Sequence, residues 1–591
     1  DYSGATQEVK SIRYAKRWRI EPSDSAAYRR GELVRPVKQL VFYIDSLMPV
    51  KWNPYIKAGA ESWNKAFEKI GFKDVICVKE FPKNDTLFNA NSFDCMTIRY
   101  SASWLNSAQT TIHSDTRTGE ILNASILINA NMISVQYADR IGATVAIDPR
   151  VRTTVFPQEI QGELIQAAIA QAVGTGLGLT MNWGASCAYP VDSLRSASFT
   201  QKYGLASSVM GGVIINDVAT EEDVRNGVCL VNTKPGPYDE LVIKYLYQPI
   251  YASSLQEEKE TLDSWIREHT GDPYYAYIRN QSRFDSDPRN SRGSLGDDHL
   301  KSFDYMLPNV RKGFENYYSW FAKEDRDFLM RRRVHSALSE RLSGRIYAIL
   351  SYIGGIYLND IREKDAIPSY SMVDREKQKA ALSKALELAK NLDWVDDTAH
   401  LNEFEISDKK ADRLRLDIFN GIFGRLPYVE VCTERFPDAA YTASEYLDDI
   451  YGIVWEGVLK HRPLENFERA LQTAFLENII STSTATAPIG SFKASKTGFA
   501  ATGKPEINLA ALRNGGKVDM KMYSLQNAEE VAGFSSIPPI YTNQTKIAAY
   551  YFDLLMRTKD MLKKAISTAP EADRSHYDLL IYRINKATEI E

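Results

Sequence analysis

Apolar residues recur at two different spacings in the first third of the chain, and these spacings predict alternating strands and helices. Four short runs rich in β-branched and aromatic residues are typical of strands: 38–45, 74–81, 94–100 and 124–133. Residues 51–71 instead place apolar side chains at helical spacing and end at Gly71. A second helical pattern begins at Pro157 and continues through Val173. This order predicts an α/β domain.

From about residue 300 the strand pattern disappears and helical spacing dominates. We expect helical segments at 314–321, 334–357, 376–392, 443–459, 464–480, 547–566 and 576–587. Segment 481–517 is rich in Ser, Thr, Ala and Gly, which predicts a loop. A chain of 591 residues exceeds one ordinary core. We therefore divide it into an N-terminal extension (1–30), an α/β domain (31–300) and a mainly α-helical C-terminal region (301–591).

Composition narrows the classes of function. Hydrophobic residues make up 44% of the chain and charged residues 25%, as in ordinary globular proteins. The formal net charge of -4 does not favour nucleic acid as a partner. No apolar run reaches the length of about 18 residues that a membrane helix needs, so we expect no transmembrane segment. The five cysteines do not form a disulfide scaffold, although Cys77 and Cys95 could pair.

Segment 171–181 has the frame of a zinc-peptidase helix and turn without the reactive residues. In the pattern H-E-x-x-H-x-x-G-x-x-H, three His hold zinc and the Glu acts as base. The same positions here are Gln171, Ala172, Thr175, Gly178 and Met181. Amide, hydroxyl and thioether groups are poor zinc ligands, and an alanine methyl group cannot accept a proton. The sequence therefore predicts no catalytic residue, no metal and no other cofactor at these positions.

Metal ligands elsewhere in the chain remain an alternative. The seven histidines include no pair at helical i, i+4 spacing, and the cysteines show no C-x-x-C spacing. Asp297, Asp298 and His299 resemble a small metal cluster, but neighbouring carboxylates of this kind also begin helices. A site assembled from distant residues is the other way in which a metal would be bound.

Several longer blocks carry a more specific signal: 17–21, 41–45, 63–67, 117–122, 188–196, 295–298, 445–449 and 576–580. Together they resemble the large zinc-dependent metalloproteases of Bacteroidota, which are metzincin-like. Active members have approximately His-Glu-Val-Gly-His-Thr-Leu-Gly-Leu-Arg-His-Asn where this chain keeps Val173, Gly174, Leu177, Gly178, Leu179 and Asn182. Met210 matches the methionine of the family's Met-turn.

The resemblance implies a fold, a cofactor in active relatives and a location. The fold is an α/β metzincin-like metalloprotease domain followed by a mainly α-helical region, and active relatives bind zinc. The resemblance also implies export to the periplasm, the outer-membrane surface or the extracellular space. Because the zinc ligands are replaced here, we expect an inactive homologue, a pseudopeptidase that binds a protein or peptide as a component of the bacterial envelope.

In a metzincin, the strand at 124–133 would be the edge strand that lines the cleft. Peptides that add to a sheet edge bind through backbone groups, so Ile126, Leu127 and Ile128 are candidate binding residues, and a purely structural strand is the alternative. Two other functions stay open. One is an active metallopeptidase with unrecognised ligands. The other is a glycan- or nutrient-binding accessory protein that uses the aromatic stretch Tyr274, Tyr275 and Tyr277.

Overall fold

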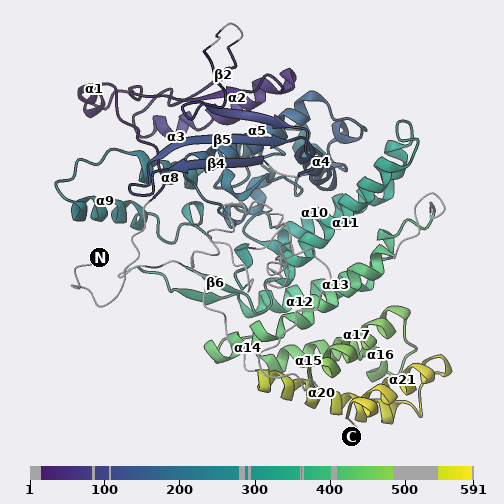
Figure 1. Cartoon of the computed structure of the whole chain (residues 1–591). Coiled ribbons are helices and arrows are strands. Elements are labelled where there is room, and N and C mark those ends of the chain that lie inside the picture. Colours follow the sequence, from purple (N-terminus) through teal and green to yellow (C-terminus); the bar gives the residue numbers. More distant parts are fainter. Residues whose placement is uncertain are drawn as a thin grey trace, which may run out of the picture. The chain divides into compact units, whose positions relative to one another are not determined.

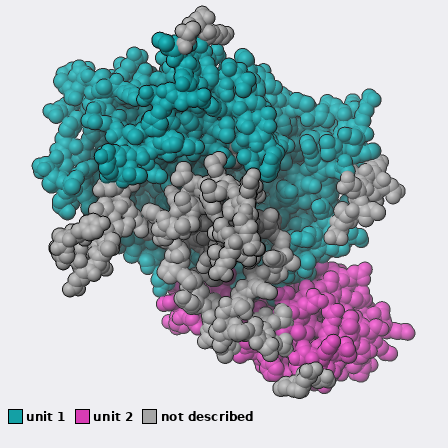
Figure 2. Space-filling view, in the orientation of Figure 1, with its two compact units in different colours: residues 1–280, 286–425 teal, residues 281–285, 426–591 magenta. Residues whose placement is uncertain are grey.

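The computed structural model divides the chain into two compact units (Figures 1 and 2). The described residues are 15–82, 85, 87–105, 108–278, 286–290, 294–359, 361, 365–400, 409–483 and 544–588, without the side chains of 481–483 and 544–546. Unit 1 lies within residues 1–280 and 286–425, and unit 2 consists mainly of residues 426–591. The units therefore divide near residue 425, whereas the sequence led us to place a boundary at 300.

A five-stranded sheet forms the centre of unit 1 (Figure 1). Its strands are β1 (Leu40–Ile44), β2 (Ile76–Glu80), β3 (Met96–Ser101), β4 (Ala108–Ser114) and β5 (Ile121–Asn129). Their order across the sheet is β2-β1-β3-β5-β4, and β4 alone runs antiparallel to its neighbour. The predicted α/β character is confirmed, and β1, β2 and β3 lie where the sequence pattern places them.

The prediction of an edge strand at 124–133 is wrong. Strand β5 ends at Asn129, and helix α4 (Ala130–Thr144) begins directly afterwards. Strand β5 is also internal, since Ile126 lies opposite Ile98 of β3 on one side and Thr110 of β4 on the other. The edge strand next to β5 is β4, which we did not predict. Its one aliphatic residue beyond Ala108 is Ile112, so its burial pattern is not visible as an apolar alternation.

One apolar core joins the sheet to helices α2 (Asn53–Glu61), α3 (Asn64–Glu68) and α5 (Gln158–Gly176). The helical pattern at 51–71 is thus realised as a short turn, η1 (Val50–Trp52), followed by two helices. Between the helices, the fully buried Trp63 donates its indole N–H to the Ala170 carbonyl at 2.8 Å. This contact fixes α5, the helix that carries segment 171–176, against the rest of the core.

The remaining elements of unit 1 are mainly helical. They are α1 (Ser25–Arg29), η2 (Pro149–Val151), η3 (Ala185–Cys187), η4 (Val191–Arg195), α6 (Ala197–Tyr203), η5 (Val209–Gly211), α7 (Glu221–Arg225), α8 (Pro237–Tyr247), α9 (Leu255–Arg267), η6 (Pro273–Tyr275), η7 (Pro288–Asn290), α10 (His299–Phe321), α11 (Leu329–Leu350), β6 (Ile356–Leu358), β7 (Tyr370–Met372), α12 (Arg375–Lys390), η8 (Asp393–Val395) and α13 (Lys410–Gly424). Helix α11 ends before the predicted 357, because the chain turns at Gly354 and enters β6.

The regular elements in the described part of unit 2 are all helices. Its helices are α14 (Leu426–Arg435), α15 (Ala443–Val454), α16 (Glu456–Leu459), α17 (Asn466–Ser483), α20 (Gln544–Ala565) and α21 (Glu571–Thr588). The four helical patterns predicted between 443 and 587 are confirmed, whereas α13 and α14 were not predicted. Apart from 481–483 at the end of α17, the loop predicted at 481–517 lies outside the described residues.

The N-terminal segment is part of the sheet unit from Arg17 onwards. Arg17 forms a backbone bridge with Glu120, immediately before β5. Trp18 is buried in the same core as the sheet and donates its indole N–H to the Gly176 carbonyl at 2.8 Å. The last turn of α5 is therefore held by a residue that the sequence division assigned to a separate extension.

The five cysteines are free thiols. Cys77 lies opposite Val41 of β1, while Cys95 precedes Met96, which lies opposite Phe42 from the other side of β1. Two strand spacings of about 4.8 Å each separate the two chain segments, which is farther than a disulfide reaches. The pairing of Cys77 with Cys95 is therefore wrong.

We predict that a buried histidine makes the stability of unit 1 fall in mild acid. His299, the first residue of α10, is 4% exposed, stacks on Tyr352 and lies 3.0 Å from the Pro288 carbonyl through Nε2. Burial lowers the pKa of its imidazole from 6.5 to about 4. The folded state therefore resists protonation, and this contribution to stability is complete above pH 6.5 and is lost as the pH falls towards 4.

Urea unfolding at pH 7.5 and pH 5 measures the effect. His299→Gln should lower stability at both values but reduce the difference between them, because Gln does not titrate. The control is His113→Gln, which changes an exposed histidine and should keep the wild-type difference. An unchanged difference in His299→Gln would contradict the assignment.

Candidate functional site

Helix α5 and the turn after it bring the motif positions together. Gln171 and Thr175 are one helical turn apart, so both lie on the same face of α5. The chain then turns at Gly178, whose φ is +91°. A Cβ atom at Gly178 would collide with the Lys16 carbonyl oxygen, so both the conformation and the space require glycine. This turn directs Met181 back towards the helix.

The first and third ligand positions are in direct contact. The Gln171 Nε2 atom donates to the Met181 Sδ atom at 3.2 Å. Thr175 Oγ1 donates to the Gln171 carbonyl at 3.3 Å, and Ala172 is 6% exposed. We call Gln171, Ala172, Thr175 and Met181 the motif site. Among these four residues, the hydrogen bond between Gln171 and Met181 is the contact that joins the helix to the segment after the Gly178 turn.

Met210 lies beneath the motif site. It is fully buried in η5, and a Cβ atom at Gly174 would lie 2.5 Å from both the Met210 sulfur and the Trp63 ring. The Asn182 N–H donates to the Met210 carbonyl at 3.1 Å, directly after Met181. Met210 therefore packs against both arms of the motif, as a Met-turn does.

A buried carboxylate that we did not predict fixes this turn. Asp239, in the first turn of α8, accepts the Ser208 hydroxyl at 2.5 Å and the N–H groups of Val209 and Gly236 at 2.9 Å. Complete burial raises its pKa to about 7, although the three hydrogen bonds favour the ionised form. No known sequence motif links Ser208 with Asp239, so the sequence alone does not indicate this contact.

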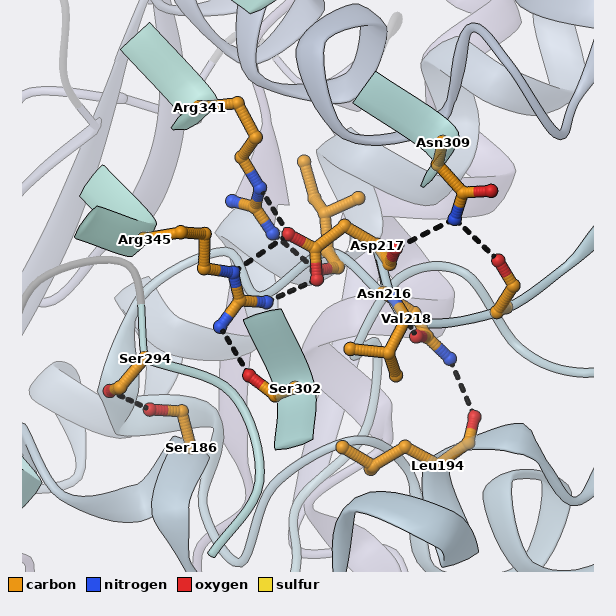
Figure 3. A network of polar contacts seen from close by, with 12 residues as sticks. Ser186, Leu194, Asn216, Asp217, Val218, Ser294, Ser302, Asn309, Arg341 and Arg345 are labelled. Carbon is orange, nitrogen blue, oxygen red and sulfur yellow. Dashed lines mark hydrogen bonds and ion pairs between the residues drawn. The ribbon is translucent and has the colours of Figure 1, made fainter. Parts of the chain in front are cut away.

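A second buried carboxylate holds the segment that follows the turn (Figure 3). Asp217 is fully buried. Its carboxylate accepts hydrogen bonds from Nε of Arg341 at 2.6 Å and from Nε of Arg345 at 2.9 Å, and both arginines belong to α11. Arg345 is 1% exposed and also donates to the Ser302 hydroxyl at 3.2 Å. Burial alone would raise the Asp217 pKa, but the two guanidinium groups hold it below its usual value. Asn309 donates to the Asp217 carbonyl at 3.0 Å.

The donor chemistry at the motif site does not suit zinc. The three groups at the ligand positions are an amide, a hydroxyl and a thioether, whereas zinc prefers imidazole, thiolate or carboxylate. In the part of the chain that the structure describes, no three His, Cys, Asp or Glu side chains gather closely enough to hold a metal ion.

The acidic cluster at the start of α10 has the structural role of a helix cap. Asp298 accepts the N–H groups of Leu300 and Lys301 at 3.0 and 3.2 Å, while Asp297 accepts the Val191 N–H. The His299 ring is buried and bonded to a backbone carbonyl. Of the two interpretations of this cluster, the structure confirms the helix N-cap.

Strand β4 lies next to the motif site. Thr110 Oγ1 donates to the Ala172 carbonyl at 2.9 Å. Among the described residues, β4 pairs only with β5, so its outer backbone edge has no strand partner. The candidate residues Ile126, Leu127 and Ile128 lie one strand farther in, and the exposed side chains at the edge are those of Gln109, Thr111 and His113. The turn at 115–119 is the sequence signal that would have revealed this hairpin.

The aromatic residues at 274–277 do not form one platform. Three separate ring contacts divide them: Tyr274 with Tyr189 at 4.9 Å, Tyr275 with His269 at 3.8 Å and Tyr277 with Tyr238 at 6.1 Å. Tyr277 alone approaches the motif site, with its hydroxyl 3.5 Å from Thr180 Oγ1.

We predict that the Asp217 network is essential for the folded state. Asp217→Asn leaves the buried charge of Arg345 without its counter-ion, and breaking such a pair costs roughly 3–5 kcal/mol. Denaturant unfolding of the purified protein measures this loss. Arg117→Ala serves as control, because the Arg117 side chain is 85% exposed and pairs with Asp115 at the surface, where a change within about 0.5 kcal/mol is expected. A loss as small as this in Asp217→Asn would refute the assignment.

Comparison with known proteins identifies the family. A family model described as Met-zincin matches residues 153–462, more than half of the chain. The match includes α5, the Gly178 turn, Met210 and the Asp217 network. No curated protein and no solved structure matches the chain. From the family model, with the Met-turn geometry in agreement, we conclude that the chain belongs to the Met-zincin family.

Proposed function

We propose that this Met-zincin protein is catalytically inactive and binds a protein or peptide segment in extended form along β4. The observation that carries the proposal is the contact between Gln171 and Met181. These residues stand where active relatives have zinc-binding histidines, and their side chains are joined by a hydrogen bond. The family fold is retained, while the groups that would hold zinc are replaced.

The chemistry of hydrolysis supports the first half of the proposal. Zinc peptidases need three protein ligands, an open position for water and a base that removes its proton. The side chains of Gln171, Thr175 and Met181 are poor ligands, and the Ala172 methyl group is no base. Each loss alone would impair catalysis, and here all four occur together.

The sheet edge supports the second half. An edge strand offers N–H and C=O groups that an extended peptide satisfies by adding a further strand. Strand β4 offers such an edge along seven residues beside the motif site. These backbone groups do not depend on zinc. Loss of catalysis is therefore compatible with continued peptide binding.

We further propose that the protein acts in the bacterial envelope. The resemblance to exported Bacteroidota metalloproteases supports this location, and the partner would then be another envelope protein. In the described residues, no helix combines the length and apolar character needed to cross a membrane.

We predict that the wild-type protein, desalted into metal-free buffer, contains almost no zinc, and that four substitutions introduce a site. In Gln171→His/Ala172→Glu/Thr175→His/Met181→His, three imidazoles replace the groups at the three ligand positions of the motif, so about one zinc per chain is expected. Elemental analysis of both proteins measures this. The control is Gln171→His/Ala172→Glu, which supplies only one of the three imidazoles.

Each result is decisive. About one zinc per wild-type chain would overturn the inactive assignment and favour an active metallopeptidase with other ligands. A folded quadruple variant without zinc would contradict our placement of the motif site.

We predict that an extended peptide protects β4 from amide hydrogen exchange. The probe is a seven-residue peptide of alternating Thr and Val, and its addition should slow exchange in 108–114 but change little in β5, which already pairs on both sides. Two control peptides have the same sequence. One is N-methylated at the odd-numbered residues and the other at the even-numbered residues, so that each lacks the N–H donors along one of its two edges. Unchanged exchange in β4 would refute peptide binding, and protection of 273–277 by oligosaccharides would favour the glycan-binding function.

A further inference from the structure

Trp104 is exposed to an unusual degree for a tryptophan. Its relative exposure is 82%, and it is the one exposed tryptophan among the nine in the chain, all of which the structure describes. Its neighbour Leu105 is 39% exposed. Tryptophan is highly buried on average, and at protein interfaces it is enriched among the residues that dominate binding. The exposed indole therefore suggests a contact with a partner.

The backbone that carries Trp104 is held in place. The Asn131 side-chain amide, in the first turn of α4, donates to the Trp104 carbonyl at 2.9 Å. The Ser103 hydroxyl accepts the Leu105 N–H at 3.2 Å, and the Ser103 carbonyl accepts the Asn131 N–H at 3.4 Å. When a partner contacts the indole, little of the backbone around Trp104 therefore remains to be ordered, and this lowers the entropic cost of binding.

Trp104 also lies near the end of the exposed sheet edge. Strand β3 ends at Ser101, opposite Asn129, and β4 begins at Ala108, opposite Ile128. Both positions lie at the end of β5, where α4 starts (Figure 1). The four residue steps from Trp104 to Ala108 span at most about 14 Å. A peptide that pairs with all of β4 and continues past Ala108 can reach the indole.

We propose that Trp104, assisted by Leu105, anchors one end of the extended peptide that binds β4, and that it selects a bulky apolar or aromatic side chain there. The inference rests on the proposed function. Along the strand, the exposed side chains of Gln109 and Thr111 carry no charge and provide no ionic selection, while the third exposed side chain, His113, lies at the end away from Trp104. Side-chain preference then arises at the Trp104 end, through burial and ring stacking.

The test compares two peptides of equal length by calorimetric titration. Both contain seven alternating Thr and Val residues and two further residues at each end. These are one Gly and one Trp in the first peptide and two Gly in the second. The wild-type protein should bind the Trp-flanked peptide about tenfold more tightly. Trp104→Ala should remove this preference without changing the affinity for the Gly-flanked peptide, and Trp104→Phe should retain most of it. Tyr582→Ala, which removes another exposed aromatic ring, should behave as wild type.

The outcomes separate this inference from the proposed function. If Trp104→Ala keeps the full preference, the anchor is refuted while peptide binding stands. If the wild-type protein binds both peptides equally, the selectivity is refuted. If it binds neither and β4 exchange is unchanged, the proposed function fails, and the anchor fails with it.

Discussion

The ion pairs between Asp217 and the two arginines of α11, Arg341 and Arg345, are the interaction on which the fold of unit 1 depends. They join the segment after the Met-turn to a helix more than 120 residues later in the chain. A charge buried to this extent is tolerable only when its partners are present. The segment after Met210 therefore reaches its position only when α10 and α11 are correctly packed against it.

A second layer of contacts positions the motif site itself. Trp63 and Trp18 donate to carbonyls in the last two turns of α5, and Asp239 fixes Ser208 and Val209, the two residues directly before Met210. None of these contacts involves a ligand position. The frame around segment 171–181 is thus built from apolar packing and backbone hydrogen bonds, and it forms with or without groups that bind a metal.

The sequence predicted those parts of the fold in which local pattern and burial coincide. Strands β1 to β3 and helix α5 have apolar residues at the expected spacing. The family motif also indicated the turn at Gly178 and the Met-turn at Met210. Strand β4 was missed because its half-buried face contains Ala108, Thr110 and Ile112, only one of them strongly apolar. The assignment of the edge to Ile126–Ile128 failed for the same reason. Asp217, Asp239 and Trp18 act through partners distant in sequence, which a single chain does not reveal.

The packing at Gly174 has a consequence for how such a protein can change over time. Any side chain at this position would meet Met210 and Trp63, so these three residues constrain one another regardless of activity. The hydrogen bond between Gln171 and Met181 involves neither Met210 nor Trp63, so it adds nothing to the constraint among these three residues. Selection for a folded protein alone would therefore preserve the glycine, the methionine and the tryptophan, so a Met-turn by itself records the fold and does not indicate catalysis.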